Sequence, residues 1–130
     1  MELYILIGIL IALILFSVYR YLKQRRILKT ISEEEFREGY RKAQLIDVRE
    51  PKEFDGGHIL GARNIPLTQL KQRMNELRKD QAIYLYCQNG SRTGRAAVML
   101  HKKGYSDLSQ LQGGFKKWSG KIKKSKKASY

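Results

Sequence analysis

The chain of 130 residues has little cysteine, little histidine and few acidic side chains. Its single cysteine, Cys87, excludes an intrachain disulfide and fits a reducing compartment. The two histidines are widely separated from it and from each other, which disfavours a zinc site. No internal repeat is visible. We therefore expect one domain with no metal and no cofactor.

Acidic residues number 12 against 26 basic ones, and the excess lies at two flanks. Residues 20–29 carry five Lys or Arg, and residues 116–127 carry seven lysines, with no acid in either segment. The rest is nearly balanced. No recognised module supports RNA contact, so we expect no nucleic-acid partner. The flanks suit an anionic lipid surface, while a merely solvated lysine tail explains residues 121–130 equally well.

The segment from Leu3 to Tyr19 contains no charge, no proline and one glycine. As a helix it would be about 26 Å long, close to the thickness of a bilayer core. A domain this small cannot enclose a helix that is apolar on all sides. A cleaved signal peptide would need a basic start and a small-residue cleavage site, which are missing here. We predict an uncleaved transmembrane helix over residues 3–19.

Charge predicts how this helix is oriented. Glu2 is the one charged side chain before the span, whereas several basic residues follow it closely. The positive-inside rule then places the rest of the chain in the cytoplasm of a single-pass cell-membrane protein. We expect a basic juxtamembrane linker over residues 20–30, a domain over 31–118 and a basic flexible tail over 119–130. A protein beginning near Lys29 is expected to fold by itself.

Strand and helix patterns alternate through the domain. Ser32 and Glu35 have the spacing of a helix N-cap and its capping box. Short apolar runs predict strands at residues 44–48, 62–65, 82–86 and 108–111. An amphipathic helix is predicted between the second and third of these, with one apolar face formed by Leu67, Leu70, Met74 and Leu77. This order predicts an α/β fold whose parallel sheet is flanked by helices on both faces.

Cys87 comes directly after the strand predicted at residues 82–86, and a helix is predicted from Thr93 to a C-terminal Gly104. A thiol reacts as its thiolate, which a helix N-terminus and a nearby arginine favour. Arg92 closes the loop. Gly90 allows the backbone to turn so that successive N–H groups face one anion. The candidate catalytic residues are Cys87 and Arg92. The candidate anion-binding loop consists of Gln88, Asn89, Gly90, Ser91 and Thr93.

This loop, with the sequence Cys-Gln-Asn-Gly-Ser-Arg, resembles the active-site loop of the rhodanese family of sulfurtransferases. Further stretches resemble the family's other signatures in the same order, at residues 46–54, 57–66 and 113–118. The resemblance covers about residues 31 to 118. It implies that Cys87 takes sulfur from a sulfane donor, such as thiosulfate or a low-molecular-weight persulfide, carries it as a persulfide, and passes it to a thiol or protein acceptor.

Three other polar residues of the domain are assigned structural roles. Asp47 and Arg49 resemble a structural pair of the family, and we expect a salt bridge that fixes the end of a strand beneath the loop. His58 has a side chain suited to acid and base chemistry. The resemblance implies instead a structural histidine in a turn.

Two other functions stay open at this stage. Phosphatases and arsenate reductases on related folds also place a cysteine and an arginine around an anion. The spacing here is Cys-x₄-Arg, and a ring of N–H groups closed by so few residues fits one sulfur atom better than a tetrahedral phosphoryl group. Glu50, Glu53 and Asp55 would approach the loop only through folding. The second alternative is a non-catalytic interaction module tethered to the membrane.

Overall fold

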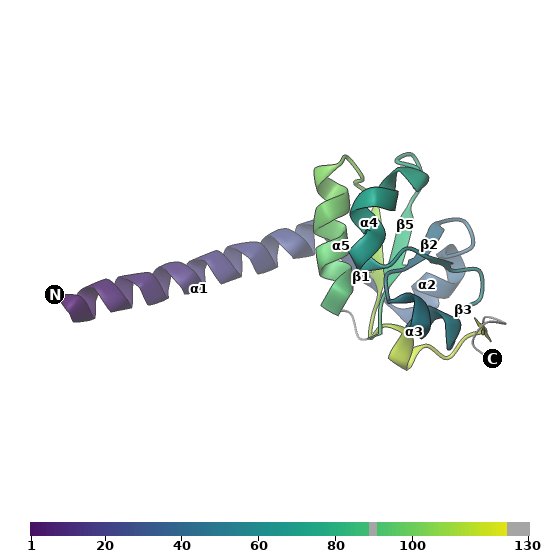
Figure 1. Ribbon diagram of the computed structural model, residues 1–130, viewed down its shortest axis with the longest axis horizontal. Coiled ribbons are helices and arrows are strands. Elements are labelled where there is room, and N and C mark those ends of the chain that lie inside the picture. Colours follow the sequence, from purple (N-terminus) through teal and green to yellow (C-terminus); the bar gives the residue numbers. More distant parts are fainter. Residues whose placement is uncertain (89–90, 125–130) are drawn as a thin grey trace.

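In the computed structural model, which describes residues 1–88 and 91–124, a long N-terminal helix leads into an α/β domain (Figure 1). This helix, α1, runs from Glu2 to Ile27 and projects away from the domain (Figure 1). Its part from Glu2 to Lys23 has the length and composition of a membrane span, which a signal sequence also has. The most apolar part of that stretch is not buried against the domain.

Five parallel strands form the main sheet, in the order β1-β6-β5-β2-β4. Their bounds are Leu28–Ile31 for β1, Gln44–Asp47 for β2, Arg63–Asn64 for β4, Ile83–Tyr86 for β5 and Leu108–Leu111 for β6. A separate antiparallel pair joins β3, His58–Ile59, to β7, Ile122–Lys123. The predicted parallel α/β class is confirmed.

Helices connect the strands. They are α2 (Glu33–Gly39), α3 (Pro51–Asp55), α4 (Leu67–Arg73) and α5 (Ser91–Lys102), with 3₁₀ turns η1 (Met74–Glu76) and η2 (Phe115–Lys117). Ser32 caps α2 as predicted, because its hydroxyl oxygen accepts a hydrogen bond from the Glu35 N–H at 3.2 Å. Gly104 follows α5 with φ +96°, the left-handed conformation expected after a helix end.

The core lies on both faces of the sheet, and β5 shows why. Ile83 and Leu85 point into a cluster with residues of α4, α5 and the end of α1. Tyr84 and Tyr86 point to the opposite face, where Phe36 of α2 lies. Successive side chains of a strand alternate between faces, so a strand covered on both sides is apolar at every position.

The N-terminal boundary differs from the expected one. Residues 20–30 do not form a separate linker, because α1 continues to Ile27 and β1 begins at Leu28. Both residues are buried in the core, at 8% and 5% exposure, and Leu28 pairs with Leu108 of β6. The domain therefore begins before residue 31. Arg26 and Lys29 are exposed on either side of the buried Ile27 and Leu28, and a count of charges does not detect this burial.

The C-terminal boundary differs as well. Residues 119–130 were expected to form a flexible tail, but Ile122 and Lys123 form β7. The Lys121 carbonyl accepts hydrogen bonds from the Leu60 N–H at 3.1 Å and from the indole N–H of Trp118 at 3.2 Å. Backbone pairing holds this segment although its side chains are mostly lysines.

Candidate active site

Cys87 directly follows β5 at the carboxyl edge of the sheet, as predicted. Ligand sites in open parallel α/β sheets lie at this edge. The thiol-bearing residue is fully buried, with 0% exposure, and α5 begins four positions later at Ser91. Asn89, Gly90 and the side chain of Ser91, all predicted to belong to the anion loop, lie outside the described part of the structure.

Asp47 and Arg49 form the expected pair below the loop. The guanidinium of Arg49 donates to both Asp47 carboxylate oxygens, with the shortest contact at 2.7 Å. It also donates to the Gly57 carbonyl at 2.7 Å and to Oε1 of Gln88 at 3.1 Å. Burial by itself would lower the pKa of Arg49, but its hydrogen bonds and charge interaction with Asp47 outweigh this and raise it. The charged guanidinium of Arg49 thus links the end of β2 and the backbone at Gly57 to Gln88, the first loop residue after Cys87.

Arg92 lies in the first turn of α5 and forms a bidentate ion pair. Its two terminal nitrogens donate to the Glu53 carboxylate at 2.7 and 3.0 Å. The hydrogen bond to Glu53 outweighs the effect of burial and raises the pKa of Arg92. The same hydrogen bond lowers the pKa of Glu53 and keeps it ionised. Folding therefore brings one of the three candidate acids, Glu53, to the loop.

Thr93 is fully buried inside the first turn of α5. Its hydroxyl donates to Oε1 of Gln110, and the Gln110 amide donates to the Thr30 hydroxyl at 2.8 Å. Thr93 thereby fixes the start of α5 to the ends of β6 and β1. This side-chain role in positioning the helix was not predicted from the sequence.

Gly114 allows the segment after β6 to press against the reactive loop. The Cys87 carbonyl accepts a hydrogen bond from the Phe115 N–H at 2.8 Å, and the Gln88 carbonyl accepts one from the Lys116 N–H at 3.1 Å. Gly114 has φ +67°, and a Cβ there would lie 2.6 Å from the Cys87 carbonyl oxygen. The Gly113-Gly114 pair was recognised as a family signature, but its contact with the loop required the structure.

His58 has the structural role predicted for it. Its Nδ1 lies 2.8 Å from the Phe54 carbonyl oxygen, and its ring stacks on the Phe54 ring with centroids 3.6 Å apart. Tyr86 is buried, and its hydroxyl accepts a hydrogen bond from the N–H of Ile59, the residue after His58, at 3.1 Å. Burial raises the pKa of Tyr86, and the Asp47 carboxylate adds to the effect.

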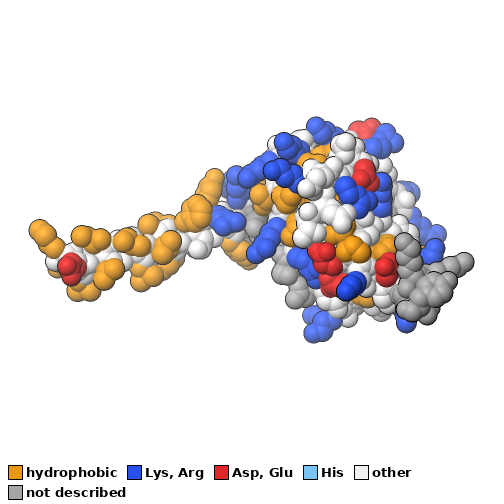
Figure 2. Space-filling model, viewed as in Figure 1, with side chains coloured by type: hydrophobic (Ala, Val, Ile, Leu, Met, Phe, Trp, Pro, Cys, Tyr) orange, Lys and Arg blue, Asp and Glu red, His pale blue; other side chains and the backbone are white. Residues whose placement is uncertain are grey.

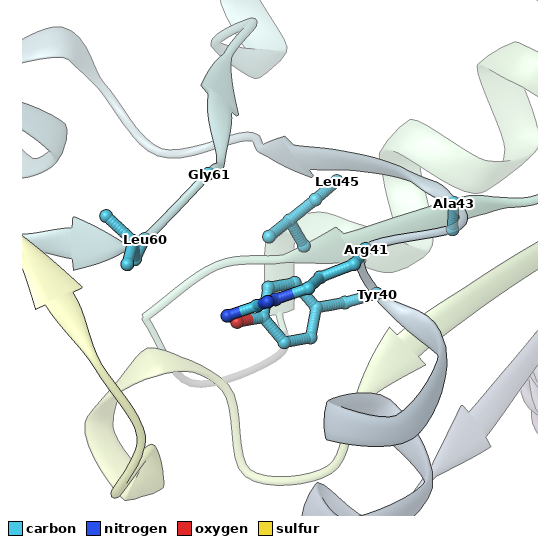
Figure 3. Close-up of a pocket in the computed structure, with 6 residues that line it drawn as sticks. All are labelled: Tyr40, Arg41, Ala43, Leu45, Leu60 and Gly61. Atoms are coloured by element: carbon cyan, nitrogen blue, oxygen red, sulfur yellow. The ribbon is translucent and has the colours of Figure 1, made fainter.

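A cavity of about 310 Å³ lies elsewhere (Figure 3). Tyr40, Arg41, Ala43, Leu45, Leu60 and Gly61 line it. These residues come from the end of α2, the start of β2 and the turn before β4 (Figure 3). It thus lies toward the amino edge of the sheet, away from Cys87. Within the described residues, no group of three or more His, Cys, Asp or Glu side chains is placed to hold a metal.

A model of the rhodanese-like domain family matches residues 32–121. The chain belongs to the rhodanese-like domain family. The matched residues run from the N-cap of α2 to the segment after η2, and they include Cys87, Arg92 and Glu53. The four motifs found in the sequence therefore belong to one domain. Several relatives of this domain are named sulfurtransferases.

Among individual proteins, this rhodanese-like chain is 63% identical over 122 residues to the uncharacterized protein YqhL of Bacillus subtilis, covering 94% of this chain and 97% of that protein. It is 33% identical over 76 residues to the thiosulfate sulfurtransferase GlpE of Pseudomonas aeruginosa, covering 58% of this chain and 69% of that protein. A solved structure, the reduced CoADR-RHD of Bacillus anthracis, matches with a TM-score of 0.64 and 42% identity, over 69% of this chain and 16% of that chain.

Proposed function

We propose that the protein is a membrane-anchored sulfurtransferase that carries sulfane sulfur as a persulfide on Cys87. The observation that carries the proposal is the position of Cys87 between the carboxyl end of β5 and the start of α5, with Arg92 in the first turn of that helix. Relatives named sulfurtransferases support the same chemistry. The buried position also suits a persulfide, which needs protection from water and from competing nucleophiles.

The reaction takes place in two displacements. In the first, the Cys87 thiolate attacks the outer sulfur of the donor, the sulfur–sulfur bond of the donor breaks, and its electron pair leaves with sulfite or with a thiolate. In the second, a thiolate or another nucleophile attacks the outer sulfur of the Cys87 persulfide and regenerates the Cys87 thiolate. No net oxidant or reductant is consumed, and no cofactor is required.

Each loop residue has a proposed part in these steps. Arg92 stabilises the thiolate and the departing charge. The backbone N–H groups of Gln88 to Thr93 form the cradle for the anion. A phosphatase reading is weaker, because Glu53, the acid that folding brings to the loop, is held ionised by Arg92 and is a poor proton donor for a leaving alcohol.

The proposed location is the cell membrane, with α1 as a single span and the domain in the cytoplasm. Arg20, Lys23 and Arg26 are exposed on the last turns of α1, where the positive-inside rule expects them. Basic side chains gather on the side of the domain nearest α1 (Figure 2). There α5, which packs against the end of α1, exposes Arg95 and Lys102. This surface would face anionic lipid, whereas β7 lies on the far side of the domain (Figure 1).

Mass spectrometry tests the chemistry. The full-length protein in detergent is incubated with thiosulfate or with cysteine persulfide, and the peptide containing Cys87 is examined for one added sulfur atom. Addition of sulfur to the wild type, its loss on treatment with a thiol, and no transfer by Cys87→Ser are expected. No added sulfur from either donor, or wild-type turnover in Cys87→Ser, would reject the proposal. Hydrolysis of an aryl phosphate, measured in parallel, is expected to be negligible.

A further inference from the structure

The ion pair between Arg92 and Glu53 joins the reactive loop to a helix far from it in sequence. Both Arg92 terminal nitrogens are bonded to Glu53, one to each carboxylate oxygen, at 2.7 and 3.0 Å. Their side chains keep 29% and 34% of their exposure, so the pair lies at the rim of the site and not in the core. A bidentate pair of this kind fixes the direction of the guanidinium as well as its charge.

Glu53 is held in place by α3 itself. It occupies the N3 position of a capping box, in which its Oε1 accepts a hydrogen bond from the Glu50 N–H at 3.2 Å. The Glu50 carboxylate in turn accepts a hydrogen bond from the Thr68 hydroxyl at 3.2 Å. The carboxylate facing Arg92 is therefore preorganised, and Arg92 meets it without a rearrangement of α3.

Arg49 and Arg92 each form an ion pair with a carboxylate, Arg49 with Asp47 and Arg92 with Glu53, so part of the positive charge of each is offset. Lys116 of η2 reaches the loop through its backbone N–H, which donates to the Gln88 carbonyl, but its side chain and that of Lys117 are exposed to solvent, where water and salt screen their charges. A donor entering beside Cys87 therefore meets one more fixed negative charge than the Cys-x₄-Arg motif alone suggests. The repulsion between the Glu53 carboxylate and a donor grows with the negative charge of the donor.

Sulfane donors differ in that charge. Thiosulfate is a dianion that leaves as sulfite, so two negative charges must be accommodated beside the Cys87 thiolate throughout the transfer. A low-molecular-weight persulfide leaves as a thiolate with at most one negative charge at the reacting end. Building on the sulfur transfer proposed above, we infer that Glu53 is a specificity-determining residue that favours persulfide donors over thiosulfate.

The variant Glu53→Gln tests this inference in the full-length protein in detergent. Glutamine keeps the capping-box acceptor and removes the charge, so α3 should stay folded. The KM for thiosulfate is expected to fall about tenfold, which corresponds to one charge about 6 Å away in a partly screened site. The KM for cysteine persulfide should change less than about twofold. Added salt should shrink the difference between the wild type and Glu53→Gln.

Two control variants separate charge from structure. Glu76→Gln removes the same charge from a surface acid that pairs with Arg63 and Arg73, and it should leave both KM values unchanged. Glu53→Asp keeps the carboxylate and should restore most of the wild-type preference. Equal changes with both donors in Glu53→Gln, or a thiosulfate effect that is independent of salt, would overturn the inference while leaving sulfur transfer intact. A wild-type Cys87 that accepts no sulfur from either donor would instead overturn the proposed function and the inference with it.

Discussion

The backbone carbonyl of Cys87 accepts a hydrogen bond from the backbone N–H of Phe115, across a distance of 2.8 Å. The segment after β6 thus forms part of the support of the reactive loop. Arg49 completes this support, since its guanidinium lies over the Phe115 ring at 4.3 Å while it donates to Gln88. The first contact holds the backbone carbonyl of Cys87, and the second holds the side chain of the next residue, Gln88.

Gly114→Ala should disrupt this support. The left-handed backbone disfavours a side chain, and the new Cβ would lie 2.6 Å from the Cys87 carbonyl oxygen and 2.7 Å from that of Gln88. We expect a loss of about 3 kcal/mol in the free energy of unfolding, and lower turnover. Gly61→Ala is the matched control, because Gly61 has φ +93° with no atom within 4 Å. It should lose about 1–2 kcal/mol and keep its turnover. Equal effects in the two variants would contradict the proposed contact with the loop.

Asp47→Asn should destabilise the domain strongly. Asp47 and Arg49 are 0% and 2% exposed, so the substitution leaves a buried guanidinium without its counter-ion. The expected loss in the free energy of unfolding is about 3–5 kcal/mol, measured by urea denaturation. Asp80→Asn removes an acid from an exposed pair with Arg78 and should leave the midpoint unchanged. A midpoint for Asp47→Asn equal to that of the wild type would show that the pair does not hold the domain together.

The junction between α1 and β1 should matter for folding. A protein beginning at Arg26 retains Ile27 and Leu28, whereas one beginning at Lys29, the start suggested by the sequence, loses two buried core residues. The shorter protein should be less stable by about 3–5 kcal/mol or fail to fold. Leu28→Ala in the longer protein should cost about 2–4 kcal/mol. Ile122→Ala, at a residue that is 50% exposed, should cost much less. Equal stability of the two truncated proteins would place the domain boundary back near residue 31.

The predicted orientation in the membrane can be tested with single-cysteine proteins. Cys87 is buried and therefore a poor target, so Ser106→Cys, at an exposed position, is introduced into a Cys87→Ser background. In intact cells a membrane-impermeant thiol reagent should label Ser106→Cys only after permeabilisation. Glu2→Cys, at the other end of α1, should be labelled without it. The reverse pattern would place the domain outside the cytoplasm, and release of a soluble, shortened protein would indicate a cleaved signal sequence.

Local sequence patterns predicted much of the fold. The cap at Ser32, the left-handed Gly104 and the strand at Leu108–Leu111 are each specified by a few adjacent residues, and all three are present. The salt bridge between Asp47 and Arg49 was predicted from the family resemblance and is confirmed. The domain boundaries were less predictable. Residues 28–31 and 122–123 pair with strands far away in the chain, and composition does not reveal such pairing.

The sequence by itself determined the class of fold, the long apolar helix and the placement of Cys87 between a strand and a helix, because these depend on periodicity and on neighbouring residues. Only the tertiary structure decided which distant groups contact the loop that contains Cys87. Glu53 and Arg92 are 39 positions apart, and Phe115 reaches Cys87 from the segment after another strand. The physical reason is that a parallel sheet collects the carboxyl ends of distant strands at one edge, so the charges and hydrogen bonds there are set by topology.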